Sequence, residues 1–307
     1  MDIKPMNYLK NSNIAKVLLV ALLGLMVTFA GCIGSSDDST DKSDEKVVKL
    51  GLPPWPGATV KSEVVKEILE SKGYTVELMK LDAGIVYAQM ADGELDGTVA
   101  AWLPVTQAEY WKQYEDKLDK VNANLAKAGV GLAVPTYVYD SGIKSVADLK
   151  GNGEKFDGTI VGIEPGAGVV INTEKALTEY ELTDFKLKTS STPAMIAELD
   201  KSIKNKEFVV VTLWEPQSAF IKFNITMLED PKNIYGGSEQ VYTIVRKDFK
   251  DDNPEVYSFF QKFNISSETQ SEWIYKYSDL NEDPSEIAKE WVKNNPEAVA
   301  EWTKDMN

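Results

Sequence analysis

Short runs rich in β-branched residues alternate with helical patterns along most of this 307-residue chain. Strands are expected at residues 47–52, 75–79, 97–101, 159–163, 187–190, 208–213 and 241–245. Helices are expected at residues 59–71, 85–92, 168–180 and 192–205, and from residue 254 toward the C-terminus. Strands that alternate with helices predict an α/β fold, in which largely parallel sheets are covered by helices on both faces.

The alternation occurs twice, which predicts two lobes with a cleft between them. The chain is expected to cross from one lobe to the other near residues 134–139 and 239–245. In open α/β sheets, ligands bind where the carboxyl ends of strands lead into loops. Loops after the strands are therefore the first place to look for a site.

The N-terminus has the features of a secretory signal. Lys4, Lys10 and Lys16 precede an apolar run at residues 17–27, and Phe29-Ala30-Gly31-Cys32 follows. We expect residues 1–31 to be a signal peptide, Cys32 to be a lipid attachment point and residues 32–46 to be a polar tether. The alternative is a single transmembrane anchor, but the apolar run is shorter than the ~20 residues that a spanning helix needs.

Composition excludes several classes of function. The chain has no His and a single Cys. It therefore cannot be a Ser-His-Asp or Cys-His hydrolase, and it cannot bind a metal through His. The net charge of −15 argues against nucleic-acid binding, which needs basic residues. We expect no metal, no cofactor and a monomer.

Three tryptophans share one local context. Trp55, Trp102 and Trp214 each follow a β-type run directly, and a proline comes within two residues of each. Because proline blocks the continuation of a central strand, each Trp is expected just beyond a strand end. The other four tryptophans, at positions 111, 273, 291 and 302, lie in helical stretches and are expected to pack in the core. Packing is the alternative reading of the first three as well.

Tryptophan faces suit a quaternary ammonium ligand. Such a cation has no N–H to donate, but it is attracted to indole rings, with about 0.5–2 kcal/mol for each contact. A carboxylate on the same ligand would need donors, and the Gly-rich turn at residues 162–168 leads from a strand into a helix N-terminus. A plain tight turn remains the alternative for that segment.

Residues 97–104 (GTVAAWLP), followed by Tyr110 and Trp111, resemble a motif of the glycine betaine/proline betaine-binding proteins of ABC importers. Residues 131–138, 162–168, 194–199 and 228–231 resemble further segments of that family, in the same order. The resemblance covers nearly the whole chain beyond the tether.

The resemblance implies a two-lobed periplasmic-binding-protein-like fold of type II, with the ligand in the cleft between the lobes. It implies lobe 1 at residues 47–137 plus 241–307 and lobe 2 at residues 138–240. Its cation cage matches Trp55, Trp102 and Trp214, and its carboxylate site matches the backbone amides of Gly162 and Ile163. Gln107 stands where the family has a carboxylate-binding His, and it offers neutral donors only.

By this resemblance the chain captures glycine betaine or a related quaternary ammonium solute without doing chemistry on it. The implied partners are an ABC permease subunit with its cytoplasmic ATPase, and the implied location is the outer face of the cell membrane. The alternatives are an exported carboxylate-dependent hydrolase, a surface adhesion or structural lipoprotein, and a binding protein for choline or another methylated amine.

Overall fold

The structure, a computed structural model, describes residues 46–306. The predicted signal peptide, Cys32 and the tether up to residue 45 lie outside the described residues. Within residues 46–306, no helix is both long enough and apolar enough to span a bilayer.

The first half of the body is built on five strands in the order β2-β1-β3-β9-β4. Their bounds are β1 (Val47–Leu52), β2 (Thr75–Lys80), β3 (Gly97–Leu103), β4 (Leu118–Pro135) and β9 (Glu239–Arg246). β1 is parallel to β2 and β3, whereas β9 is antiparallel to both β3 and β4. The predicted alternation in this half is confirmed, and antiparallel strands extend its parallel core.

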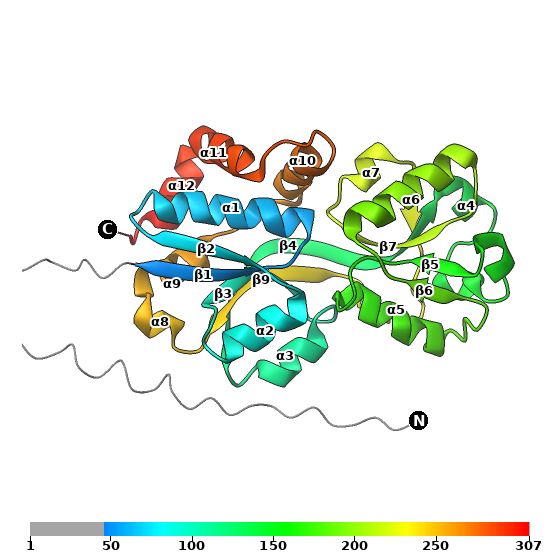
Figure 1. The fold of residues 1–307 in the computed structure, drawn as a ribbon, viewed down its shortest axis with the longest axis horizontal. Helices are drawn as coiled ribbons and strands as arrows, with labels where there is room; N and C mark the ends of the chain where they lie inside the picture. The colour runs from blue at the N-terminus through cyan, green and yellow to red at the C-terminus, as the bar shows by residue number, and fades with distance from the viewer. Residues whose placement is uncertain (1–45, 307) are drawn as a thin grey trace, which may run out of the picture. The chain divides into compact units, whose positions relative to one another are not determined.

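Helices cover both faces of this sheet (Figure 1). α1 (Pro56–Glu70) lies on one face, beneath α10 and α11, while α2 and α3 lie on the other. The remaining bounds are α2 (Ala83–Ala91), α3 (Ala108–Tyr114), α8 (Phe249–Asp252), α9 (Pro254–Lys262), α10 (Ser267–Ser278), α11 (Pro284–Asn294) and α12 (Pro296–Thr303). α1 starts three residues before its expected position because Pro56 occupies its first turn, where proline loses no hydrogen bond.

The second half is built on β4-β7-β5-β6, with β8 beside β4. These strands are β5 (Thr159–Val161), β6 (Lys186–Lys188), β7 (Val210–Glu215) and β8 (Ile225–Met227). The helices are α4 (Thr136–Asp140), α5 (Gly168–Glu179), α6 (Thr192–Asn205) and α7 (Ala219–Lys222), with 3-10 turns at Val146–Leu149 and Gly153–Phe156. β5 is parallel to β6 and β7, as the second βα alternation predicts.

The crossing between the halves differs from the prediction. The 18-residue strand β4 pairs with β9 up to Ala128 and with β7 from Gly129 onward, so it belongs to both sheets. Most of the crossing expected near residues 134–139 lies instead in helix α4 (Thr136–Asp140). Polar residues interrupt the first half of β4, and for this reason its sequence lacks a strand pattern. The limits of the lobes given above stay a prediction.

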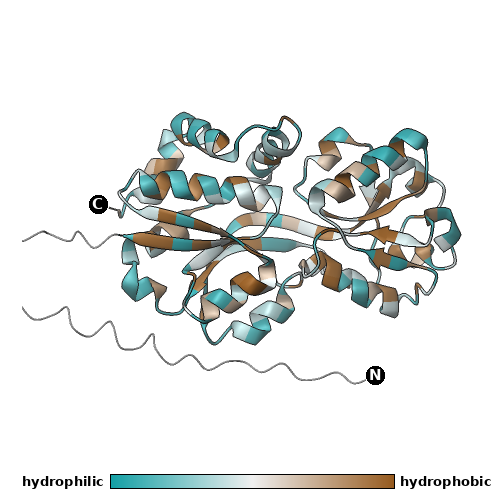
Figure 2. Cartoon of the chain, viewed as in Figure 1, coloured by the Kyte–Doolittle hydropathy of each residue, from teal (hydrophilic) through white to brown (hydrophobic). Residues whose placement is uncertain are grey.

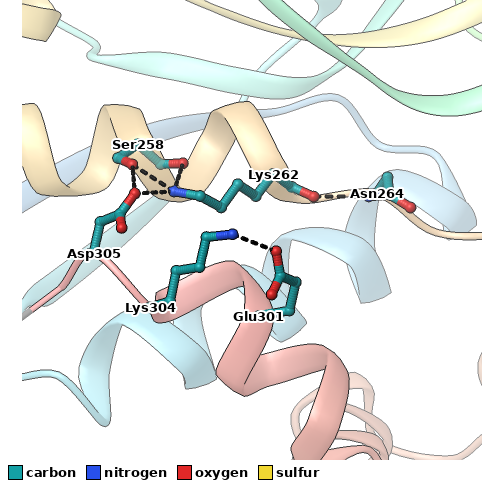
Figure 3. Close-up of polar contacts among 6 residues, drawn as sticks. All are labelled: Ser258, Lys262, Asn264, Glu301, Lys304 and Asp305. Carbon is teal, nitrogen blue, oxygen red and sulfur yellow. Dashed lines mark hydrogen bonds and ion pairs between the residues drawn. The ribbon is translucent and has the colours of Figure 1, made fainter.

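One apolar cluster lies in the first half, and another fills the second half and extends into the first through Leu52, Trp55 and Ala58. Most strands are hydrophobic, and the outer faces of the helices are hydrophilic (Figure 2). In the first half, Trp291 stacks on Trp302 at 5.5 Å and meets Trp273 edge-on at 5.4 Å. The predicted packing role of these three tryptophans is confirmed. The end of the chain is tied to α9, since Asp305 accepts hydrogen bonds from Ser258 and Lys262 (Figure 3).

Candidate ligand-binding site

Trp55, Trp102 and Trp214 line one pocket, which holds about 520 Å³ with its open mouth. The other lining residues, from both halves of the body, are Gly57, Ala58, Lys61, Ala100, Thr106, Val130, Ile163, Ala167, Gly168, Val169, Val241 and Gln270. Segments far apart in the sequence therefore meet at a single concave site.

The tryptophans sit at the carboxyl ends of strands, but two lie within the strand itself. Trp102 belongs to β3 and Trp214 to β7, each one residue before the strand ends. The expectation that both lie beyond their strands was wrong. The prolines at positions 104 and 216 directly follow the last paired residues, so they end the strand after the Trp and not before it. Trp55 is the N-cap residue of α1.

The start of α5 forms the opposite part of the wall through Ala167, Gly168 and Val169. The first N–H groups of a helix have no partner within the helix, and the helix dipole makes its N-terminus attractive to anions. Ile163 also lines the pocket, and in the described part of the chain its N–H donates no hydrogen bond. These backbone groups are available to a carboxylate.

Gly162 and Gln107 are not among the lining residues. The Gly162 N–H donates to the Lys188 carbonyl at 2.8 Å, so it is already used. The Gln107 side chain is 1% exposed, and its Oε1 accepts from the Trp102 N–H and the Tyr87 hydroxyl, both at 3.0 Å. Its Nε2 has no hydrogen-bond partner within residues 46–306. In this geometry Gln107 holds the backbone of Trp102.

Two polar lining residues were not singled out in the sequence. Gln270 of α10 lies directly over Gly57, and a Cβ atom at Gly57 would come within 1.8 Å of the Gln270 Nε2. Gln270 is 5% exposed, and its Oε1 has no hydrogen-bond partner among the described residues. Because α10 is distant in sequence, only tertiary packing brings it to the pocket.

The second such residue is Lys61 of α1, which lies one turn after Gly57 and is 1% exposed. Its Nζ donates to the Asn124 Oδ1 at 2.7 Å. Burial lowers the pKa of the Lys61 ammonium from its usual value to about 7. The sequence pattern of α1 gave no sign that Lys61 is buried, because a lysine on an amphipathic helix is normally exposed to solvent.

The two halves touch at the rim of the pocket. The Tyr110 hydroxyl of α3 donates to the Gly166 carbonyl at 2.8 Å, and Lys175 of α5 pairs with Glu109 at 3.1 Å. Thr106 is held by Glu239 of β9, whose carboxylate accepts hydrogen bonds from the Thr106 N–H at 2.6 Å and the Val105 N–H at 2.7 Å. These contacts join the two halves beside the pocket.

A family model for the substrate-binding domain of ABC-type glycine betaine transport systems matches residues 46–294. The chain belongs to this family. A Listeria monocytogenes glycine betaine/carnitine transport binding protein is 45% identical over 153 residues, which is 49% of this chain and 51% of that protein. The match thus spans about half the length of this curated relative.

Two solved structures of this kind share the fold. A lactococcal binding protein in its closed form with glycine betaine has a TM-score of 0.78 at 36% identity, covering 84% of this chain and 100% of that one. An ABC-transporter choline-binding protein with choline has a TM-score of 0.81 at 26% identity, covering 85% and 92%. The predicted two-lobed type II fold is therefore confirmed.

At Gly168 the second half lies so close to the first that there is no room for a side chain. A Cβ atom at Gly168 would lie 1.9 Å from the backbone oxygen of Thr106, which cannot rotate away. Gly168→Ala is expected to push α5 from the rim and to weaken glycine betaine binding at least tenfold by calorimetry. Gly129→Ala is the control, because its Cβ would meet only the Gly237 oxygen at 3.6 Å. Equal affinities in the two variants would contradict this role for Gly168.

Proposed function

We propose that this protein captures glycine betaine or a closely related zwitterion for an ABC importer, without chemical change to the ligand. The observation that carries the proposal is the convergence of Trp55, Trp102 and Trp214 on one pocket. The bound solutes of the glycine betaine complex and of the choline complex both carry a trimethylammonium group, for which indole faces are a suitable wall.

The cation half of the ligand would lie among the three tryptophans. Trp55 and Trp214 are 8% and 6% exposed, so their rings are shielded from bulk water. Cation–π attraction grows when the cation is desolvated, reaching about 2 kcal/mol for a contact. Exclusion of water from the methyl groups adds a hydrophobic contribution.

The carboxylate half would bind at the N-terminus of α5. The free N–H of Ile163 and the first-turn N–H groups of Gly168 and Val169 are the proposed donors. Gly162 and Gln107 then support the site from behind, Gly162 through Lys188 and Gln107 through the Trp102 N–H.

The proposed partners are a membrane permease subunit and its cytoplasmic ATPase, with the protein as a monomer on the extracytoplasmic side. Lipid attachment at Cys32 would hold the protein at the membrane, and the polar residues up to 46 would act as a tether between the anchor and the folded body. Family membership and the printed role of the Listeria relative as a transport binding protein support this arrangement.

The decisive experiment compares glycine betaine with glycine in thermal unfolding of the purified protein. The two compounds share a carboxylate and differ in the methyl groups on nitrogen, so a tryptophan cage should bind glycine betaine and not glycine. At 100 times its dissociation constant, glycine betaine should add about 2.7 kcal/mol to the free energy of unfolding. For a body of this size that corresponds to a rise in Tm of roughly 5–10 °C. Equal shifts with both compounds would refute the cage.

A further inference from the structure

The ligand pocket is lined by a buried lysine, Lys61, which a tryptophan cage for a cation does not need. Among the charged side chains of residues 46–306, only Lys61 and Glu239 are buried, at 1% and 0% exposure. Glu239 is satisfied by hydrogen bonds from the Val105 N–H, the Thr106 N–H and the Thr106 hydroxyl. Lys61 has no such set of partners.

The charge of Lys61 is unbalanced in the described structure. Its ammonium has three donors, and one of them goes to Asn124, a neutral side chain. Asn124 in turn donates to the Val99 carbonyl and the Thr243 hydroxyl, so it is held in place. Within residues 46–306, Lys61 forms no ion pair, and the lining of the pocket includes no Asp or Glu.

We propose that Lys61 is a specificity-determining residue that selects zwitterions, which carry an anionic group beside the quaternary ammonium, over net cations such as choline. This inference rests on the proposed function and deepens it. It assigns a role to a side chain of α1 that lines the same pocket as the proposed carboxylate donors of α5.

The physical reason is the low effective dielectric constant of a largely apolar pocket. Choline would bring a second positive charge beside Lys61 with nothing to offset it, and like charges repel strongly where water is excluded. A betaine brings its own carboxylate, which offsets the Lys61 charge. The lowered pKa of Lys61 supports this reasoning, because it reflects the cost of a lone buried cation at this position.

The first test compares glycine betaine and choline by calorimetry in the wild type, Lys61→Met and Lys66→Met. Methionine retains the length and apolar body of the lysine side chain. Lys66 lies on the same helix, pairs with Glu70 and does not line the pocket, so it is the matched control. The ratio of the choline Kd to the glycine betaine Kd should fall at least tenfold in Lys61→Met and stay within twofold of wild type in Lys66→Met.

A second test needs no variant. At pH 7, binding of glycine betaine should take up protons, because a nearby carboxylate favours the charged form of Lys61, while choline should release them. Isothermal titration in buffers of different ionisation enthalpy measures both. Other titratable groups beside the pocket include Glu239 of β9, which is bonded to Thr106, Tyr87 of α2 and Tyr110 of α3. Burial raises the pKa of both tyrosines, so they stay protonated at pH 7.

Opposite proton exchange with the two ligands would support the inference, as would the loss of selectivity in Lys61→Met. An unchanged Kd ratio in that variant, or identical proton exchange with both ligands, would overturn it while leaving the proposed function intact. Failure of the wild type to bind either compound would overturn the proposed function, and this inference with it.

Discussion

Replacing Trp102 with alanine is expected to weaken glycine betaine binding at least 100-fold. The change removes a cation–π contact of about 2 kcal/mol in a desolvated site. It also removes apolar surface from the ligand's surroundings, and full burial of a large apolar side chain contributes roughly 1.5–3 kcal/mol. A loss of about 2.7 kcal/mol is already a 100-fold change in Kd. Calorimetric titration measures it directly.

Trp111→Ala is the matched control for that experiment. Trp111 is partly buried on α3, close in sequence to Trp102, and does not line the pocket. Its variant should bind glycine betaine within about twofold of wild type. Trp302 is a poor control, because its ring packs against Phe263 and Trp291 and its loss would leave a cavity in the core. If Trp102→Ala and Trp111→Ala bind equally well, the cage is misplaced.

Lys61→Met is expected to stabilise the ligand-free protein in a pH-dependent way. The pKa of Lys61 falls from 10.5 in the unfolded chain to about 7 in the fold. Folding therefore releases a proton between these pH values, and the wild type becomes more stable as pH rises from about 7 to 10.5. At 1.36 kcal/mol per pKa unit, the buried charge costs the wild type about 5 kcal/mol below pH 7 and slightly less at pH 7 itself.

The methionine variant lacks this cost but leaves the Asn124 Oδ1 without its donor, which offsets about 1–3 kcal/mol. The offset does not depend on pH, so the measured quantity is the change in the stability difference. Urea unfolding of both proteins at pH 7 and pH 10 should show the advantage of the variant shrinking by about 3 kcal/mol. A difference that is constant with pH would show that Lys61 keeps an ordinary pKa.

The local sequence pattern was sufficient to predict that Trp55, Trp102 and Trp214 come together. Each was placed at a strand end because a proline follows it, and strand ends of an α/β fold gather on one side of the sheet. Trp102 and Trp214 lie in the last two residues of their strands and not in the following loops. This difference does not change the site, because the end of a strand and the loop after it lie at the same edge of the sheet. The hydrogen bond from the Gly162 N–H to the Lys188 carbonyl could not be predicted locally, because its partner lies 26 residues away in sequence.

The sequence by itself determined the α/β class, the two-lobed arrangement and the tryptophans of the pocket, because periodicity and proline positions act over a few residues. Tertiary structure alone decided that β4 runs through both sheets, that Gln107 supports Trp102 and that Gln270 and Lys61 enter the pocket. Those features depend on which helices cover α1 and on which strands β4 meets. A lysine on an amphipathic helix becomes a buried charge only when distant segments close over it.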